Sequence, residues 1–303
     1  CHIISAGKEK ETDKPVVIST WQSIYGMPKS YFERFEFMVG DEAHLFKAKS
    51  LTSVMSKLKK CRYKFGTTGT LDDTQTHRLI LEGLFGPIFS VTQTKDLIDA
   101  GYLSQFSIKA LILTYSNEAK AECKGFSYQD EMDYLVRHPK RNKFIRNLAI
   151  DLKGNTLLLF QFVEKHGKIL YNIIKEKAED NRKVFFVHGG VDGSDREEIR
   201  KITEKETDAI IVASFGTFST GINIRNINNI VFASPSKSKI RVLQSIGRGL
   251  RISENKNSIL VFDIADDISY KERRNFTLTH FTERINIYNE QQFAYEISRV
   301  NLK

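Results

Sequence analysis

Short apolar runs alternate with longer amphipathic stretches along most of this 303-residue chain, and this alternation restricts the possible fold more than any other feature. Most of the runs are rich in β-branched or aromatic side chains and lack polar alternation, which is typical of strands covered on both faces. The expected strands cover residues 16–19, 37–40, 63–67, 157–160, 184–187, 210–213, 230–233 and 259–262.

Helical patterns fill the intervals between these runs. Residues 163–177 have apolar positions at helical spacing, and residues 196–203 follow a capping residue, Ser194 or Asp195. Alternating strands and helices predict α/β architecture with parallel sheets. Five of the expected strands begin at or after Leu157 and three lie before it, so we expect two sheets, the first of them N-terminally incomplete.

The expected boundary between the sheets lies near Gly101. A helical pattern over residues 94–100 ends at this glycine, which suits a helix C-cap, and residues 106–113 then form an expected crossing strand. After the last apolar run, residues 270–300 have apolar positions typical of a helical tail. The predicted limits are 1–103 for the first domain, 104–265 for the second and 266–303 for a helical C-terminal extension.

Composition sets outer bounds on function. The chain is 41% hydrophobic, enough for two cores, and 46 basic against 37 acidic side chains give a net charge of +9. This charge suits a polyanionic partner, although solvated helix surfaces explain it equally well. The three cysteines lack metal-ligand or disulfide spacing, no apolar run approaches the ~20 residues of a membrane helix, and no signal peptide opens the chain. We therefore expect a soluble, cytoplasmic protein without membrane contacts.

An acidic pair directly follows one expected buried strand. Asp41 and Glu42 begin the tetrapeptide Asp-Glu-Ala-His after residues 37–40. In this position Asp41 can hold a hydrated Mg²⁺ and Glu42 can activate the attacking water. A loop acid pair or a helix cap is the alternative for Asp-Glu alone, but the whole tetrapeptide is more specific. His44 faces either a γ-phosphate or the second domain, or is a satisfied structural histidine.

Two hydroxyl-bearing segments follow neighbouring expected strands. Thr68 and Thr70 lie in a Gly/Thr turn, where their hydroxyls can bond to the acidic tetrapeptide and couple hydrolysis to domain movement. A turn present for steric reasons is the alternative. Thr20 and Trp21 follow residues 16–19 and offer a contact to a nucleic-acid backbone, although a single tryptophan is more often core.

The second half carries a glycine- and hydroxyl-rich segment, residues 214–223, which we expect to be a loop leaving a strand. Ser214 and Thr217 offer hydroxyls to a nucleic-acid phosphate or ribose, Gly221 permits close approach of the backbone, and Asn223 ends the segment. An ordinary loop between a strand and a helix is the alternative.

A glutamine and two arginines follow in residues 244–251. Arg248 and Arg251 are three residues apart on one predicted helix face, where both can reach a γ-phosphate. Gln244 can contact nucleotide or link to Glu42. Surface charge is the usual reading of an arginine pair, but the neighbouring glycines are poor helix formers and make a plain solvated face less suitable.

The phosphate-binding loop of nucleotide-hydrolysing proteins is missing. No Gly-x-x-x-x-Gly-Lys-Ser/Thr sequence occurs, and the chain begins at Cys1 with an apolar stretch. We therefore expect this chain to be the C-terminal part of a longer protein, and we expect ATP hydrolysis of the complete protein rather than of this chain alone.

Taken in order, these segments resemble the superfamily 2 helicases and translocases, most closely the phage recombination helicases. Asp41 to His44 match motif II, Thr68 to Thr70 motif III, residues 214–223 motif V and residues 244–251 motif VI. The sequence is also similar to that of these helicases in residues 15–22, 64–66, 212–221, 238–240 and 300–302. The resemblance implies two RecA-like domains that use ATP and Mg²⁺ to unwind, anneal or branch-migrate forked DNA in recombination and repair.

The resemblance also implies roles for single residues. Asp41 and Glu42 match the Mg²⁺ and catalytic positions, Arg251 the arginine finger and Arg248 its γ-phosphate partner, whereas Gly221 and Asn223 match contacts to nucleotide. The implied partners are branched DNA and recombination proteins, in the host cytoplasm if a phage encodes the protein. Two alternatives stay open: another superfamily 2 motor, such as an RNA helicase or a restriction translocase subunit, and a non-catalytic nucleic-acid-binding module derived from a helicase.

Overall fold

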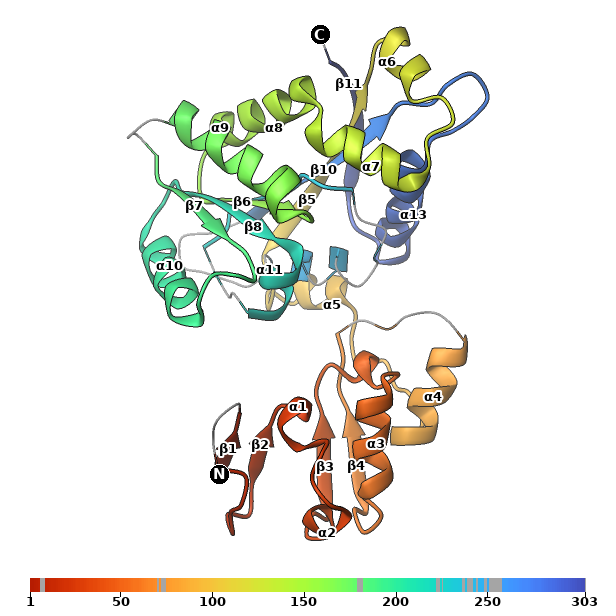
Figure 1. Cartoon of the computed structure of the whole chain (residues 1–303), viewed down its shortest axis with the longest axis vertical. Coiled ribbons are helices and arrows are strands. Elements are labelled where there is room, and N and C mark those ends of the chain that lie inside the picture. The colour runs from red at the N-terminus through yellow and green to blue at the C-terminus, as the bar shows by residue number, and fades with distance from the viewer. Residues whose placement is uncertain are drawn as a thin grey trace. The chain divides into compact units, whose positions relative to one another are not determined.

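The computed structural model divides the chain into two compact units, residues 1–91 and 92–303, and each is described by itself (Figure 1). The structure describes residues 1–5, 9–69, 71, 75–178, 182–221, 224, 226–235, 238, 242–243, 245–247, 250 and 258–302. None of the helices in these residues is long and apolar enough to span a membrane.

Unit 1 contains two pairs of parallel strands. β1 (His2–Ile4) pairs with β2 (Val17–Ser19), and β3 (Phe37–Gly40) pairs with β4 (Tyr63–Gly66), with Gly40 opposite Gly66. The helical elements are α1 (Trp21–Ile24), α2 (Lys29–Phe32), the 3-10 helix η1 (Ala43–Leu45), α3 (Lys49–Lys57) and α4 (Gln75–Phe85). The three strands expected in this half are present.

One face of these strands packs on the core of unit 1, and the other does not. Helix α3 buries Leu51, Val54 and Met55, whose spacing of three and four residues places them on one side of the helix. On the other strand face, Phe37 is 57% exposed and Phe65 is 52% exposed. The expectation that the strands are covered on both faces is therefore wrong for β3 and β4 in the described structure, because alternate side chains point away from the core.

Unit 2 contains a seven-stranded sheet whose strands are all parallel, in the order β11-β5-β10-β9-β6-β8-β7. The strands are β5 (Gln105–Thr114), β6 (Thr156–Phe160), β7 (Val184–Val187), β8 (Ile210–Ser214), β9 (Asn229–Phe232), β10 (Ser258–Asp267) and β11 (Tyr295–Asn301). Every residue of β6, β8 and β9 is buried. This sheet confirms the predicted parallel α/β class.

Helices cover both faces of this sheet (Figure 1). They are α5 (Thr94–Asp99), α6 (Asn117–Glu122), α7 (Tyr128–Arg137), α8 (Pro139–Asp151), the π-helix η2 (Val163–Gly167), α9 (Lys168–Ala178), α10 (Gly193–Lys205), α11 (Phe215–Gly221) and α13 (Phe276–Glu290). Leu158 packs with residues of α7, α8 and α9, whereas its neighbours Leu157 and Leu159 pack with residues of α11 and α13. Alternate residues of one strand thus serve two separate cores.

The expected helical tail is only partly helical. Helix α13 confirms the prediction over Phe276–Glu290, but Tyr295–Asn301 form strand β11, which pairs in parallel with β5. The prediction is wrong there because Tyr295 and Ile297 alternate with the polar Glu296 and Ser298, the period of a strand. Pairing with β5 also satisfies backbone groups that its edge otherwise leaves open.

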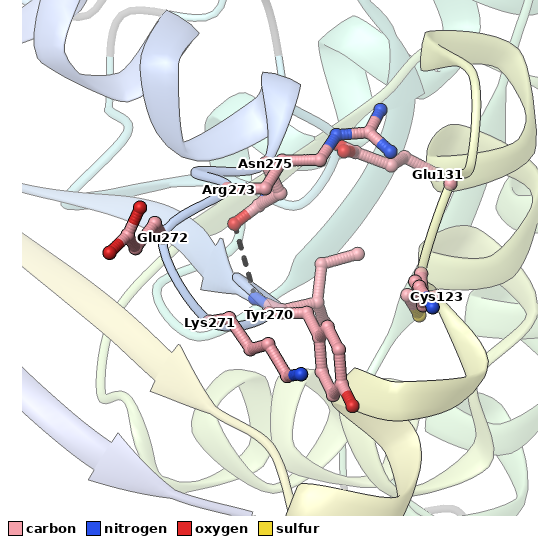
Figure 2. A pocket seen from close by; sticks show the side chains of 10 residues that line it. Cys123, Glu131, Tyr270, Lys271, Glu272, Arg273 and Asn275 are labelled. Atoms are coloured by element: carbon pink, nitrogen blue, oxygen red, sulfur yellow. Dashed lines mark hydrogen bonds between the residues drawn. The ribbon is translucent and has the colours of Figure 1, made fainter.

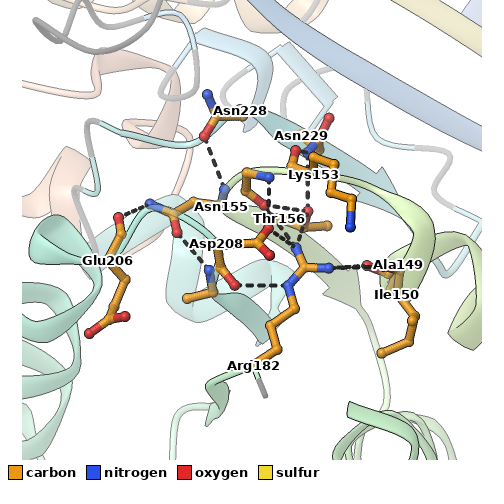
Figure 3. Close-up of polar contacts among 12 residues, drawn as sticks. Ala149, Ile150, Lys153, Asn155, Thr156, Arg182, Glu206, Asp208, Asn228 and Asn229 are labelled. Atoms are coloured by element: carbon orange, nitrogen blue, oxygen red, sulfur yellow. Dashed lines mark hydrogen bonds and ion pairs between the residues drawn. The ribbon is translucent and has the colours of Figure 1, made fainter.

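A polar cluster, centred on Asn155 and Arg182, lies at the amino ends of β6, β8 and β9 (Figure 3). The buried side chain of Asn155 accepts a hydrogen bond from the Ala209 backbone N–H (2.8 Å) and donates to the carbonyls of Glu206 (2.7 Å) and Asn226 (3.1 Å). One amide group therefore joins the residue before β6 to the segments that precede β8 and β9.

Arg182 is the second side chain at the centre of this polar cluster. Its guanidinium donates to the carbonyls of Ala149 (3.0 Å), Gly154 (2.9 Å) and Asp208 (2.8 Å) and pairs with the Asp208 carboxylate at 3.0 Å. Burial lowers the pKa of Arg182, and Asp208 opposes that effect. The side chain thereby ties the end of α8 to the loops that enter β6 and β8.

We expect Arg182→Ala to lower the free energy of unfolding by about 3 kcal/mol, because several carbonyls lose their donor at once. Urea unfolding followed by circular dichroism measures this loss. Lys177→Ala is the matched control, since Lys177 is an exposed cation on α9 and its loss should change stability by less than about 0.5 kcal/mol. Equal effects of the two substitutions would contradict the assignment.

Candidate functional site

The acidic turn of unit 1 lies where β3 and β4 end side by side. Asp41 Oδ1 accepts hydrogen bonds from the Glu42 backbone N–H (2.9 Å) and from Thr67 Oγ1 (3.1 Å). Backbone bonds continue the pairing beyond the strands, from Thr67 N–H to the Gly40 carbonyl (2.9 Å) and from Ala43 N–H to the Thr67 carbonyl (2.8 Å). The turn is therefore fixed to the neighbouring strand end, as expected for parallel strands that end at one edge.

Glu42 has an unusual backbone conformation. Its φ of 51° and ψ of 49° are left-handed, a region that costs a residue with a side chain roughly 1–2 kcal/mol. The hydrogen bonds of Asp41 and Ala43 on either side hold this conformation in place. The Glu42 side chain remains 42% exposed, so its carboxylate is accessible to a ligand.

His44 lies behind the acidic pair and is only 6% exposed. Its Nδ1 is 3.0 Å from Thr68 Oγ1 and 3.3 Å from Glu42 Oε2. Burial lowers the pKa of His44, and the nearby Glu42 carboxylate only partly offsets that effect. A neutral imidazole therefore connects the acidic turn to Thr68, as the sequence predicted for one of the two threonines.

Asp41 can bind a hydrated magnesium ion. Both of its hydrogen bonds use Oδ1, and Oδ2 has no partner among the residues that the structure describes. Among the described residues, no group of three or more histidine, cysteine, aspartate or glutamate side chains is placed to hold a metal ion. An ion at Asp41 would therefore take its other ligands from water and nucleotide phosphates, which is usual for Mg²⁺.

Two glycines and two aromatic rings pack closely together next to the acidic turn. A Cβ on Gly40 would lie 2.8 Å from the Phe46 ring, and one on Gly66 would lie 2.9 Å from Ala43 Cβ and 3.0 Å from the Phe85 ring. Phe46 and Phe85 meet edge to face at 5.0 Å. The sequence predicted no packing role for these glycines and rings, although glycines at the ends of two neighbouring expected strands indicate close approach. The hydrogen bond from Thr67 to Asp41 agrees with the expectation that hydroxyls after residues 63–67 bond to Asp41 or His44.

The segment expected to be a loop in unit 2 is largely helical. Strand β8 extends through Ser214, and α11 begins at once because Phe215 and Phe218, three residues apart, both bury their rings in the core. Ser214 Oγ lies 2.8 Å from Thr217 Oγ1, and both residues are buried. Their hydroxyls thus bond to each other, and Gly221 ends the helix.

Thr20 and Trp21 lie at the start of α1. Thr20 Oγ1 is 2.9 Å from Ser23 Oγ, and Trp21 packs against the core of unit 1 as a partly buried side chain. The alternative of a core tryptophan thus has structural support. Five predicted site residues lie outside the described residues: Thr70, Asn223, Gln244, Arg248 and Arg251.

We expect Gly66→Ala to destabilise unit 1 by about 1–3 kcal/mol, because the new methyl group overlaps Ala43 and the Phe85 ring. Gly83→Ala is the matched control. Gly83 lies inside α4 with no atom within 4 Å of a Cβ, so alanine should stabilise the helix by about 0.5–1 kcal/mol. Chemical unfolding of both variants measures the difference, and a neutral Gly66→Ala would contradict the close approach.

The chain is similar to several known proteins. Residues 139–253 match the helicase conserved C-terminal domain. Over 99% of its length the chain is 36% identical to the ATP-dependent DNA helicase uvsW of Enterobacteria phage T4, and it spans 62% of that protein. The crystal structure of T4 UvsW matches with a TM-score of 0.58 at 35% identity, over 99% of this chain and 62% of that one.

More distant similarities extend to other helicases and translocases. The chain is 24% identical to the putative ATP-dependent RNA helicase L396 of Acanthamoeba polyphaga mimivirus, over 83% of the chain and 48% of that protein. A fragment structure of a putative HsdR subunit of a type I restriction enzyme from Vibrio vulnificus YJ016 matches with a TM-score of 0.70. That match covers 99% of this chain and 54% of the other at 17% identity, which shows a shared fold.

Proposed function

Because the chain belongs to the superfamily 2 helicases, we propose that the complete protein hydrolyses ATP to move along DNA. The observation that carries this proposal is the acidic turn at the joined ends of β3 and β4. It presents an accessible glutamate beside an aspartate, one of whose carboxylate oxygens has no partner in the described part of the chain, and a buried histidine connects it to the next strand end. These groups suit activation of water beside a metal-bound phosphate.

Asp41 and Glu42 have separate roles in this proposal. Asp41 would hold a hydrated Mg²⁺, and the ion would neutralise charge on the nucleotide phosphates. Glu42 orients the attacking water and takes its proton. The left-handed backbone of Glu42 fixes where the carboxylate begins, so less conformational freedom is lost when a nucleotide binds.

Arg248 and Arg251 complete the site from the second of two RecA-like domains, which we place at residues 1–103 and 104–265. Arg251 acts as the arginine finger and Arg248 as its γ-phosphate partner, while Gln244, Gly221 and Asn223 contact nucleotide. His44, Thr68 and Thr70 couple hydrolysis at the acidic turn to the rest of the first domain.

The proposed substrate is branched or forked DNA, in recombination, repair or replication. Support comes from the T4 relative, which is a DNA helicase by name and is 36% identical, whereas the relative named as an RNA helicase is 24% identical. Recombination proteins are the proposed partners, and the host cytoplasm is the proposed location of a phage-encoded protein.

We expect Glu42→Gln in the complete protein to retain ATP binding and to lose hydrolysis by about 10²–10⁴-fold, because the amide cannot take a proton from water. Nucleotide binding and steady-state ATP turnover are measured separately. Glu36→Gln is the matched control: Glu36 is an exposed acid at the opposite end of β3, and its side chain makes no hydrogen bond in the described structure. Undiminished turnover in Glu42→Gln would remove Glu42 from its role.

The nucleic-acid substrate is tested by ATP turnover of the complete protein with forked DNA, linear duplex DNA and single-stranded RNA. We expect forked DNA to stimulate turnover most, and we expect strand exchange at a synthetic four-way junction. Stronger stimulation by RNA or by linear duplex would instead support one of the other motors of the superfamily. If none of the three nucleic acids supports ATP hydrolysis, the protein is instead a non-catalytic nucleic-acid-binding module derived from a helicase.

A further inference from the structure

A pocket of about 320 Å³ lies in unit 2, and its described lining contains none of the site residues named above (Figure 2). On one side it is lined by Cys123 and Lys124, which follow α6, and on the other by residues 270–273, which follow β10. Helix α6 itself follows β5. The pocket therefore lies beyond the carboxyl ends of two neighbouring parallel strands, where open α/β sheets usually bind ligands.

Positive charge dominates the accessible wall of this pocket. Lys124, Lys271 and Arg273 are exposed, and none of them forms an ion pair in the described structure. Two acids also line it. The carboxylate of Glu131 is buried and already accepts the backbone N–H groups of Phe276 (2.9 Å) and Thr277 (3.0 Å) at the start of α13. Glu272 points away from Cys123 and the interior of the pocket (Figure 2).

The two cations on the hairpin are held in place before any ligand arrives. Tyr270 and Arg273 exchange two backbone hydrogen bonds of 3.1 Å, and the turn between them places Lys271 at a φ of 52°. Arg273 Nη2 donates to the Phe126 carbonyl (2.7 Å), which anchors the hairpin to the loop on the other side of the pocket. A pre-formed arrangement of this kind reduces the entropy lost on binding.

Aromatic surface accompanies these charges. Lys271 Nζ lies 5.7 Å from the centre of the Tyr270 ring, and the Arg273 guanidinium lies 5.7 Å from that of Phe276, which is 41% exposed. Burial raises the pKa of the Cys123 thiol to about 11, so the sulfur is a neutral part of the wall. Cations that lack acidic partners, beside partly exposed rings, are the combination that binds single-stranded nucleic acid.

We propose that this pocket binds one nucleotide unit of the nucleic-acid strand on which the protein acts. Lys124, Lys271 and Arg273 hold its phosphate, and the Tyr270 ring packs against its base or sugar. This contact lies outside the helicase motifs and rests on the proposed function, since it assumes that nucleic acid is the substrate. It extends the track of the strand along the carboxyl edge of the sheet, past β5 and β10.

The test compares two double variants of the complete protein. Lys124→Gln with Lys271→Asn removes two pocket charges, and asparagine tolerates the left-handed backbone at residue 271. Lys153→Gln with Lys201→Gln is the control: both lysines are exposed, neither forms an ion pair in the described structure, and neither lines the pocket. Thermal unfolding verifies that each variant is folded.

The readout is the affinity for single-stranded and forked DNA at several salt concentrations, without ATP. The pocket variant should lower the slope of log K against log salt by about 0.7–0.9, the loss of one phosphate contact, while the control leaves the slope unchanged. Equal slopes for the pocket variant and the unaltered protein would overturn the proposal, as would equal losses in both variants.

Calorimetry with inorganic phosphate distinguishes a nucleic-acid contact from a site for a free anion. Tight phosphate binding that the pocket variant abolishes, together with an unchanged DNA salt slope, would assign the pocket to a free anion and overturn the nucleic-acid assignment. Because binding is measured without ATP, a protein that fails to hydrolyse ATP still gives a slope for each variant. Failure of the proposed hydrolysis is thereby distinguished from failure of the pocket.

Discussion

Backbone groups at the amino ends of β6, β8 and β9 need hydrogen-bond partners, and Asn155 and Arg182 each supply several of them. Neither side chain belongs to a helicase motif. Together they fix how far each strand is shifted along its neighbours, because both contact the segments that enter more than one strand. That shift determines where β6, β8 and β9 end at the carboxyl side of the sheet, where α11 follows β8. Contacts at the amino ends of these strands therefore position the segment at the carboxyl end of β8.

In unit 1, close packing rather than a polar cluster aligns the two strands β3 and β4. Gly40 and Gly66 lie opposite each other, and the absence of side chains lets Phe46 and Phe85 approach the backbone of both strands. These contacts support the acidic turn, in which Glu42 has a left-handed backbone conformation. In the proposed function, such support would hold the Glu42 carboxylate in position to within a few tenths of an ångström.

The sequence predicted what depends on local pattern and missed what depends on contacts between distant segments. Residues 37–40 and 184–187 are strands with the expected limits, and the parallel class followed from uninterrupted apolar runs. The helix over Phe215–Gly221 was missed because two glycines and several hydroxyls outweighed the burial of Phe215 and Phe218, which only the folded core reveals. A charge count likewise does not show that Arg141 is fully buried against Asp266 at 2.8 Å.

Strand β11 has a consequence for how the sheet is made. Thr114 of β5 and Val300 of β11 are hydrogen-bonded partners separated by 186 residues. A ribosome adds roughly 5–20 residues per second, so the edge of β5 waits on the order of ten to forty seconds before its partner emerges. During that interval a ten-residue strand with an unpaired edge is open to other chains. Late closure of this edge makes the nascent sheet, rather than the finished one, the state most exposed to misassembly.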